Sequence, residues 1–386
     1  MAGKVEVHGK CDPKFNNVKD AFSRGFEEEG DVGACFAATV DGKFVVDIWG
    51  GYADPARTRP WEENTIVNVW STTKAMTALC ALILVDRDQL DLDAPVAHYW
   101  PEFAQNGKEN IPVRYLLSHS SGLAGFQEPI TTEVLYDWDR AVGLLAAQKP
   151  WWEPGTASGY HSITFGYLIG EVLRRITGKS PGTFFREEVA EPLGADFHIG
   201  LPLEHDERVA ELIPPPVLKP GEEGYVDPKD MSEISRKMGN PSMPATITRE
   251  RAWRAAEIPA ANGHGNARSV ARIAALLACG GELDGVRLLS MATIEKAIEE
   301  QISGTDLVLQ VPMRFGLGFG LNSEETPVGP NPRTFFWGGW GGSLIVIDLD
   351  ARVSFSYVMN LMTTGTMGDK RSIRPARALY EALQGL

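Results

Sequence analysis

The chain has 386 residues, of which 43% are hydrophobic and 23% charged, which excludes disorder as the default and allows one large core or two smaller ones. Its net charge of −14, from 37 basic and 51 acidic residues, argues against nucleic-acid and anionic-membrane partners. Residues 1–10 contain no apolar signal region, and the longest apolar run, 78–85, is too short to cross a bilayer, so we expect a cytoplasmic protein.

The first ninety residues predict a helix, a hairpin and a second helix. Apolar spacing over 14–29 is helical and ends at Gly30. Residues 34–40 and 44–49, joined by an Asp-Gly turn, indicate two antiparallel strands. The chain then enters an apolar helix at Ser71, which we expect to end near residues 86–89.

The remaining three hundred residues change from helical to strand patterns. From about 98 to 258 we expect helices with Pro- and Gly-rich joints, at 113–117, 132–148, 164–177 and 182–192. Within that span the Pro-, Glu- and Asp-rich segment 202–243 is predicted to be a surface excursion and a candidate flap over a site. After a helix at 269–278 we expect antiparallel strands at 315–321, 333–337, 343–348 and 352–359, and a closing helix at 370–383.

A hairpin first, helices in the middle and strands last predict one antiparallel sheet built from both ends of the chain. The fold class is therefore α/β (α+β). We assign residues 1–96 and 259–386 to a discontinuous α/β domain and residues 97–258 to a mainly helical domain. A ligand site is expected in the cleft between them, and Ser71 lies at the junction.

Ser71 and Lys74 form the single Ser-x-x-Lys of the chain, at the start of the apolar helix. Helical positions three apart share a face, so Lys74 can stand beside the Ser71 hydroxyl. The helix N-terminus favours developing negative charge, and Lys74 would assist deprotonation of a nucleophilic serine. The alternative is an N-cap serine followed by a solvated lysine, and one such spacing is expected by chance in a chain of this length.

A turn-rich loop, 153–162, precedes a predicted helix and carries Tyr160, His161 and Ser162. A tyrosinate could take the proton of Ser71, provided that cations such as Lys74 lower the tyrosine pKa from its usual value of about 10. The alternative is a packed loop tyrosine whose hydroxyl binds backbone.

The stretch 335–343 places four glycines between two strands, which lets backbone approach a ligand and aim an N–H at a carbonyl oxygen. The alternative is a glycine-rich bulge or turn. The glycines at 316, 318 and 320 are not followed by a helix, so we reject a dinucleotide fingerprint.

The histidines and cysteines offer no clear alternative site. His119 is a candidate base of a serine–histidine triad, but the chain contains no Gly-x-Ser-x-Gly elbow, and a structural histidine is favoured. We predict that His161 contacts substrate and that His264 braces a loop. The four cysteines are widely spaced and suggest neither a zinc site nor a disulfide framework: Cys11, Cys35, Cys80 and Cys279.

Together these motifs resemble the serine β-lactamase and penicillin-binding-protein superfamily, most closely the family VIII carboxylesterases that are similar to class C β-lactamases. The resemblance rests on Ser71-Thr-Thr-Lys74, on 116–123, on 154–162, on 263–269 and on Trp337-Gly338-Gly339. It implies an antiparallel sheet flanked by helices beside an all-helical domain, with a site between them that needs no cofactor or metal.

Carried over to this chain, the resemblance implies that Ser71 is the nucleophile and that Lys74 and Tyr160 share its proton and later activate water. The backbone N–H groups of Ser71 and Trp340 would form the oxyanion hole. The strand edge formed by Trp337, Gly338 and Gly339 would line the acyl site, with His161 and Ser162 beside it.

Two departures from the superfamily pattern bear on the substrate. Trp337-Gly338-Gly339 stands where β-lactamases and peptidases carry Lys-Thr-Gly, so the cation that holds a substrate carboxylate is absent, and Ser162 replaces an asparagine. Family VIII esterases are similar in having Trp-Gly-Gly there. Both changes favour small neutral esters.

The leading hypothesis is a serine carboxylesterase that hydrolyses short-chain acyl esters through a Ser71 acyl-enzyme, with weak β-lactam hydrolysis allowed as a side activity. The alternatives are an acyltransferase on the same scaffold, a β-lactamase or D-alanyl peptidase-type hydrolase, and a catalytically silent binding protein. The expected partner is a small-molecule ester.

Overall fold

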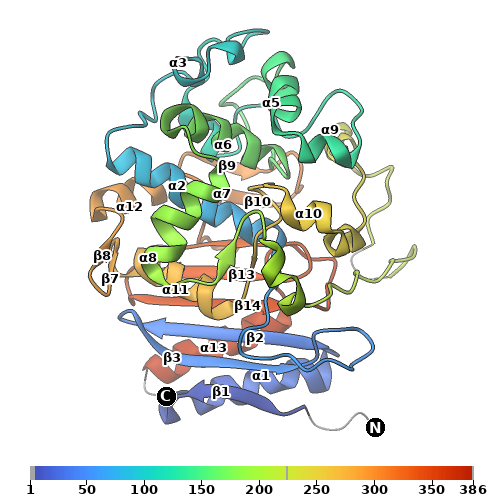
Figure 1. Cartoon of the computed structure of the whole chain (residues 1–386), viewed down its shortest axis with the longest axis vertical. Helices are drawn as coiled ribbons and strands as arrows, with labels where there is room; N and C mark the ends of the chain where they lie inside the picture. Colours follow the sequence, from blue (N-terminus) through green and yellow to red (C-terminus); the bar gives the residue numbers. More distant parts are fainter. Residues whose placement is uncertain (1–4, 223–224, 385–386) are drawn as a thin grey trace.

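A computed structural model describes residues 5–222 and 225–384 (Figure 1). The described residues form a nine-stranded sheet in the order β1-β3-β2-β14-β13-β12-β11-β10-β9, in which every neighbouring pair is antiparallel. Its strands are β1 (Val7–Cys11), β2 (Gly33–Val40), β3 (Lys43–Gly51), β9 (Ile302–Thr305), β10 (Pro312–Phe315), β11 (Gly320–Leu321), β12 (Thr334–Gly338), β13 (Leu344–Asp348) and β14 (Val353–Met359).

The N-terminal and C-terminal parts of the chain meet inside this sheet, where β2 pairs with β14 and Ala37 lies opposite Ser356. The prediction of one antiparallel sheet built from both ends is therefore confirmed. The division into two domains stays a prediction, although every strand of the large sheet comes from residues 7–51 or 302–359. The predicted ranges also include residues 1–4, 223–224 and 385–386, which lie outside the described residues.

Helices cover both faces of the sheet (Figure 1). Alternation along β14 separates the faces, because successive side chains of a strand point to opposite sides. Ser354 donates to the Ala271 carbonyl of α11 (Ala267–Ala278), whereas the rings of Phe355 and Tyr357 pack against Tyr380 of α13 (Lys370–Gln384) and Phe22 of α1 (Asn16–Glu28). The sheet is thus the middle layer between α11 and the α1–α13 pair.

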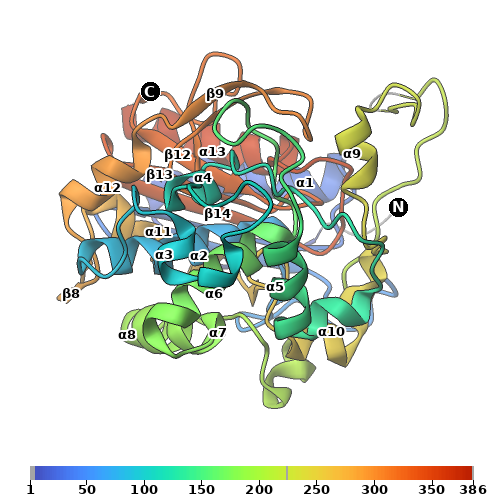
Figure 2. The same ribbon diagram turned by 90° about the horizontal axis from the view of Figure 1, so that it is seen from above.

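The central helix α2 (Thr73–Asp86) packs against α6 (Thr164–Thr177), α7 (Pro181–Phe185) and α12 (Met291–Ile298). Its residues from Thr73 to Leu84 are all buried, as its continuous apolar sequence predicts. Figure 2 shows α2 and α6 close together in the view from above. A helix buried on all sides gives Ser71 a rigid support.

The remaining helices are short and mostly follow the predicted segments. They are α3 (Val96–Tyr99), α4 (Val113–Leu117), α5 (Trp138–Ala147), the π-helical turn Arg186–Ala190, α8 (Glu191–Leu193), α9 (Glu233–Lys237) and α10 (Arg251–Ala255). Helical turns of the 3-10 type lie at Pro13–Phe15, Trp70–Thr72, Pro101–Phe103, Thr132–Tyr136, Leu203–Arg208 and Ala245–Arg249. Two small sheets combine β4 (Val67–Asn68), β6 (His264–Gly265) and β5 (Phe197–His198), and β7 (Glu282–Leu283) with β8 (Val286–Arg287).

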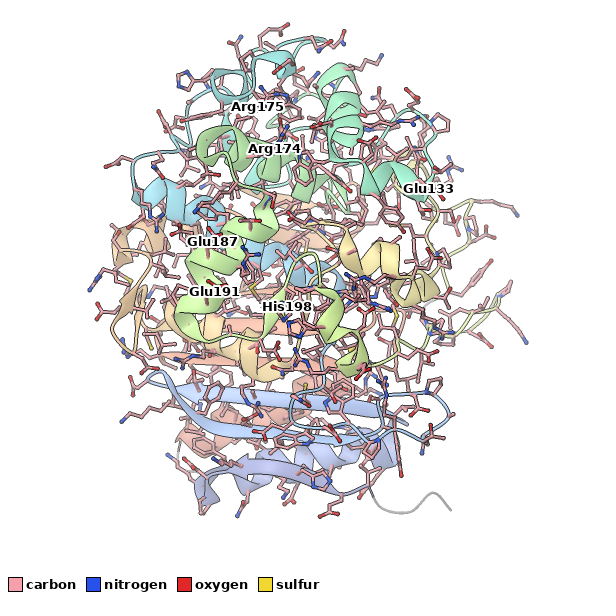
Figure 3. All side chains as sticks on the ribbon, in the orientation of Figure 1. Glu133, Arg174, Arg175, Glu187, Glu191 and His198 are labelled. Carbon is pink, nitrogen blue, oxygen red and sulfur yellow. The ribbon has the colours of Figure 1, made fainter. Side chains whose placement is uncertain are left out.

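Charged groups reinforce the helical part of the scaffold. The buried carboxylate of Glu171 accepts from Arg174 and Arg175, with N–O distances of 2.8 and 2.6 Å, and from the Trp138 indole at 2.8 Å. Figure 3 shows Arg174 and Arg175 together on α6. These contacts join α5 to α6, so this cluster is structural.

One predicted strand is partly wrong. Residues 316–319 do not continue β10 but form a turn in which the Gly316 N–H donates to the Phe319 carbonyl at 2.9 Å. Gly318 has φ +85°, and a Cβ there would lie 2.3 Å from Ala78 of α2. The alternating apolar residues pack this turn against the buried helix instead of extending the sheet.

The excursion 202–243 contains α9 and little other regular structure in its described part. Two serine hydroxyls tie α9 to the loop between β9 and β10, since Ser232 donates to Leu307 and Ser235 to Val308 at 2.9 and 3.1 Å. The flap role of this excursion stays a prediction. Across residues 5–222 and 225–384, none of the helices combines the length and apolarity that a membrane crossing requires.

Candidate active site

Ser71 lies in the 3-10 turn that leads into α2, and the residue before it has an unusual backbone. Trp70 adopts φ +48°, a conformation that costs a residue with a side chain about 1–3 kcal/mol. Its ring packs against Trp253 and Trp340, with centroid distances of 5.5 and 5.1 Å, and its carbonyl accepts from the Thr73 hydroxyl at 2.5 Å. Aromatic packing therefore holds the turn that presents Ser71.

The segment Gly263-His264-Gly265 also supports this turn. The Gly263 carbonyl accepts from the Val69 N–H and the Gly263 N–H donates to Thr73, both at 2.9 Å. β6 pairs with β4 directly before Ser71, and the Nδ1 of His264 lies 2.7 Å from the Asn262 carbonyl oxygen. This arrangement agrees with the predicted bracing role of His264.

Ser71, Lys74 and Tyr160 come together although Tyr160 is distant in sequence. The Tyr160 hydroxyl lies 2.5 Å from Ser71 Oγ, and Lys74 Nζ lies 3.1 Å from Ser71 Oγ and 2.9 Å from the Tyr160 hydroxyl. One turn of helix supplies the serine and the lysine, and the loop before α6 supplies the tyrosine. Each of the three polar atoms can therefore exchange a proton with the other two.

Burial determines the preferred protonation states of this group. Lys74 is fully buried, and desolvation places its pKa well below the usual lysine value. Its Nζ also donates to the carbonyls of Ser162 and Ala260 at 2.6 and 2.9 Å. An uncharged lysine amine has two N–H groups, and these two carbonyls can accept from both of them. The lone pair of Nζ then faces the hydroxyls of Ser71 and Tyr160.

Tyr160 shifts in the opposite direction. Its burial raises the pKa of the phenol above the usual range, and Asp306 adds to the rise, while contacts with Ser71 and Trp337 oppose it. The proposal of a resting tyrosinate is therefore less consistent with this site than an uncharged Lys74 beside a protonated Tyr160.

Asp306, in the loop between β9 and β10, positions Tyr160 and was not predicted. Its buried Oδ1 accepts from the Tyr160 N–H at 3.0 Å and from the N–H groups of Val308 and Leu309 at 2.9 Å. In the same loop, the N–H of Leu307 donates to the carbonyl of Ser158. A lone aspartate in a loop, 146 residues from Tyr160, carries no pattern that sequence reasoning could have used.

We expect Asp306→Ala to lower kcat by about 100-fold, because a displacement of about 1 Å in a catalytic group can have that effect. Asp306→Asn keeps an accepting oxygen and should retain most of the activity. Steady-state kinetics and thermal unfolding of both variants test this role. A lower Tm for the alanine variant with an unchanged kcat would reduce Asp306 to a purely structural residue.

The two histidines near Tyr160 are structural. His119 Nδ1 accepts from the His161 N–H at 3.1 Å, and its ring stacks on Trp337 at 5.4 Å. Burial holds the pKa of His119 well below its usual value. His161 is fully buried, with Nδ1 2.6 Å from the Gly159 carbonyl oxygen and Nε2 2.7 Å from Ser121 Oγ. Both ring nitrogens of His161 are thus engaged inside the loop, so the predicted substrate contact by His161 stays a prediction that these nitrogens do not support.

The turn after β12, which contains Trp340, lies directly against the turn that contains Ser71. A Cβ at Gly339 would lie 2.2 Å from the Val69 carbonyl oxygen, so only glycine allows this approach. Ser343 Oγ donates to that same carbonyl at 2.8 Å and lies 2.9 Å from Thr72 Oγ1. The two backbone segments expected to form the oxyanion hole are thus joined directly.

A buried arginine fixes the far side of this turn. Arg371 donates to the Gly341 carbonyl at 2.9 Å, and the Thr363 N–H donates to the same oxygen at 3.0 Å. Arg371 also pairs with Asp31 and Asp369, with N–O distances of 2.7 and 2.6 Å. This charge network was not predicted, since its members are far apart in sequence.

Trp337 and Gly338 lie beside Tyr160, where the superfamily pattern would place a cation. Trp337 is 4% exposed, and its ring centroid lies 5.8 Å from that of Tyr160. Its indole N–H makes no full hydrogen bond with the described residues. Ser162 is half-buried and contributes its carbonyl to Lys74. Among residues 5–222 and 225–384, no group of three or more His, Cys, Asp or Glu side chains could hold a metal ion.

The chain is similar to proteins of one family over almost its whole length. A family model described as Beta-lactamase matches residues 18–379. Esterase/beta-lactamase LipL of Mycobacterium tuberculosis is 37% identical over 361 residues, which cover 92% of this chain and 83% of that protein. A crystal structure of a family VIII carboxylesterase is 44% identical with TM-score 0.92, covering 98% of this chain and 100% of that one. A penicillin-binding protein homologue from Caulobacter crescentus is 40% identical with TM-score 0.90 and the same coverage of both chains.

The fold and these similarities define a β-lactamase-like serine hydrolase. The chain belongs to the beta-lactamase family. The predicted resemblance to family VIII carboxylesterases is confirmed, and the enzyme class is that of carboxylic ester hydrolases.

Proposed function

We propose that this protein hydrolyses short-chain acyl esters through an acyl-enzyme on Ser71. The observation that carries the proposal is the mutual contact of Ser71 Oγ, Lys74 Nζ and the Tyr160 hydroxyl, at 2.5 to 3.1 Å. Nucleophile and base within hydrogen-bond reach are the geometric requirement of covalent catalysis. The buried amine of Lys74, whose pKa burial places well below the usual lysine value, supplies the base.

In the acylation step, Lys74 Nζ takes the proton of Ser71 as Oγ attacks the ester carbonyl carbon. The bond from that carbon to the alcohol oxygen then breaks. Tyr160 gives its proton to the departing alkoxide and recovers one from Lys74, 2.9 Å away. An acyl-serine and a free alcohol result, with Lys74 uncharged again.

The negative charge on the carbonyl oxygen is stabilised by the backbone N–H groups of Ser71 and Trp340. Fixed donors of this kind are typically the largest contribution in acyl transfer. The contact of Gly339 with the Val69 carbonyl and the anchoring of Gly341 by Arg371 support this assignment. In deacylation the same Lys74–Tyr160 pair activates water, which releases the acid and restores Ser71.

The strand edge favours neutral substrates over anionic ones. Trp337 supplies a buried aromatic side chain at the position where a cation would hold the carboxylate of a β-lactam or a peptide terminus. The ring of His119 stacks on the Trp337 indole and helps to hold it at this position. We therefore expect only weak β-lactam hydrolysis.

Rates on p-nitrophenyl butyrate and nitrocefin, measured side by side, test this proposal. Butyrate turnover should dominate. Dominant nitrocefin turnover would contradict the inference from Trp337 and favour a β-lactamase. Product analysis with added methanol separates hydrolysis from acyl transfer, since an acyltransferase would form the methyl ester in place of the acid.

A further inference from the structure

A small cavity lies beside Tyr160 and Trp337. Its other walls include Leu309 and Met313 from the loop and strand after Asp306, and Thr366 and Met367 from the loop before α13. The space that the centre of a water-sized sphere can occupy in this cavity is about 10 Å³. The cavity therefore has room for roughly one water-sized group. None of its described lining residues is acidic or basic.

The position of Tyr160 identifies which part of an ester this cavity faces. Lys74 is 0% exposed and Tyr160 is 8% exposed, so of the two proton carriers only Tyr160 can be touched by a leaving group. In the proposed reaction the C–O bond breaks and the Tyr160 proton passes to the departing alkoxide oxygen. The alcohol part of the ester must therefore lie against Tyr160.

A second polar group on the cavity wall lacks a partner. The indole N–H of Trp337 is buried and lies near the Tyr160 hydroxyl without a full hydrogen bond to it or to another described residue, and Trp337 lines the cavity. A buried donor of this kind normally has a partner. The alkoxy oxygen of a bound ester, next to the Tyr160 hydroxyl, would provide one.

The cavity is kept small by backbone as well as by side chains. A Cβ at Gly338 would lie 2.3 Å from the Thr366 carbonyl oxygen and 2.7 Å from Met367 Cα. The loop of Met367 therefore lies directly on the end of β12, and the wall that it forms cannot be displaced without moving the main chain.

We propose that this cavity holds the alcohol part of the substrate and selects esters of small uncharged alcohols, methyl esters above all. The inference rests on the proposed function of Ser71. It adds that chain length is restricted on the alcohol side and that Met367 sets the limit.

Two series of alkyl esters test the proposal. One series varies the alcohol at constant acid (methyl, ethyl and butyl butyrate), and the other varies the acid at constant alcohol (methyl acetate, butyrate and hexanoate). From methyl to butyl butyrate, kcat/KM should fall at least about tenfold, because a well-packed pocket discriminates about tenfold or more per methylene. p-Nitrophenyl esters stay outside the series: nitrophenoxide leaves as a stable anion without the Tyr160 proton, so its ring need not enter this cavity and can lie in the open part of the site.

Met367→Ala should flatten the alcohol series and leave the ratios within the acid series unchanged. Met367 is half-buried, so the substitution should be tolerated, and Leu309→Ala offers a second way to open the wall. Met367→Leu preserves the volume and should keep the original selectivity. Met291→Ala, at a residue that is 40% exposed on α12, is the matched control for loss of a methionine elsewhere.

A flat alcohol series in the unaltered protein would overturn the proposal while Ser71-dependent turnover of p-nitrophenyl butyrate still supports the esterase. A change confined to the acid series in Met367→Ala would assign the cavity to the acyl group instead and also overturn it. Absence of Ser71-dependent turnover with every ester would remove the proposed function and this inference together.

Discussion

Replacing Ser71 by alanine is expected to lower kcat/KM for p-nitrophenyl butyrate by at least about 10³-fold, as for an essential nucleophile. The reason is that Oγ is the atom contacted by both Lys74 and Tyr160, and alanine leaves nothing to form the acyl-enzyme. The fold should persist, because Ser71 is partly exposed and its helix is held by the buried residues that follow. Kinetics and thermal unfolding measure both effects.

Ser23→Ala is the matched control, since Ser23 lies on α1 and its hydroxyl donates to the Lys19 carbonyl one turn away, far from the site. That variant should keep full activity. Full activity of Ser71→Ala on either p-nitrophenyl butyrate or nitrocefin would contradict the whole site assignment.

Replacing Lys74 by methionine is expected to lower kcat by about 10³-fold, within the range for loss of general acid–base catalysis. Methionine fills a similar volume but cannot accept the proton of Ser71, and it leaves the carbonyls of Ser162 and Ala260 without their donor. Lys74→Arg should not restore activity, because a guanidinium stays protonated and has no lone pair. Retention of more than about a tenth of the activity by either variant would transfer the role of base to Tyr160.

The pH profile of the unaltered protein checks the same assignment. A base with a lowered pKa is active above that pKa and inactive below it, so kcat/KM should fall as the pH is lowered through the pKa of Lys74. The raised pKa of Tyr160 keeps its proton available at neutral pH, so loss on the alkaline side should begin only above about 10. Activity that appears only above pH 10 would indicate a lysine of ordinary pKa and contradict this account.

Local sequence patterns were sufficient to predict those contacts of the site that lie within a single helix or turn. The spacing of Ser71 and Lys74 predicts their contact because helix geometry alone determines it, and the glycines after Trp337 predict the close approach that Gly339 makes. The loop 153–162 made Tyr160 one candidate base, and the resemblance then assigned it to Ser71, since no spacing rule connects two residues 89 positions apart.

The rest depended on contacts between distant segments. Asp306 reaches the Tyr160 backbone, and Arg371 reaches Gly341 and Asp31, across 146, 30 and 340 residues. His161 was assigned to substrate because it follows Tyr160, but neighbouring loop residues need not face the same way, and its ring is used inside the loop. The apolar pattern of residues 316–319 predicts a strand, whereas the structure has a turn there. A buried turn and a buried strand can have the same apolar composition, so the pattern does not distinguish them.

The central claim is that Ser71 carries the acyl group, and covalent labelling tests it most directly. The protein would be treated with a serine-directed alkyl phosphonate, digested and analysed by mass spectrometry, with Ser71→Ala treated in parallel. We predict a single phosphonyl adduct on the peptide that contains Ser71, and none in the variant. An adduct on another serine that persists in Ser71→Ala, or a protein that takes up no label, would contradict the account.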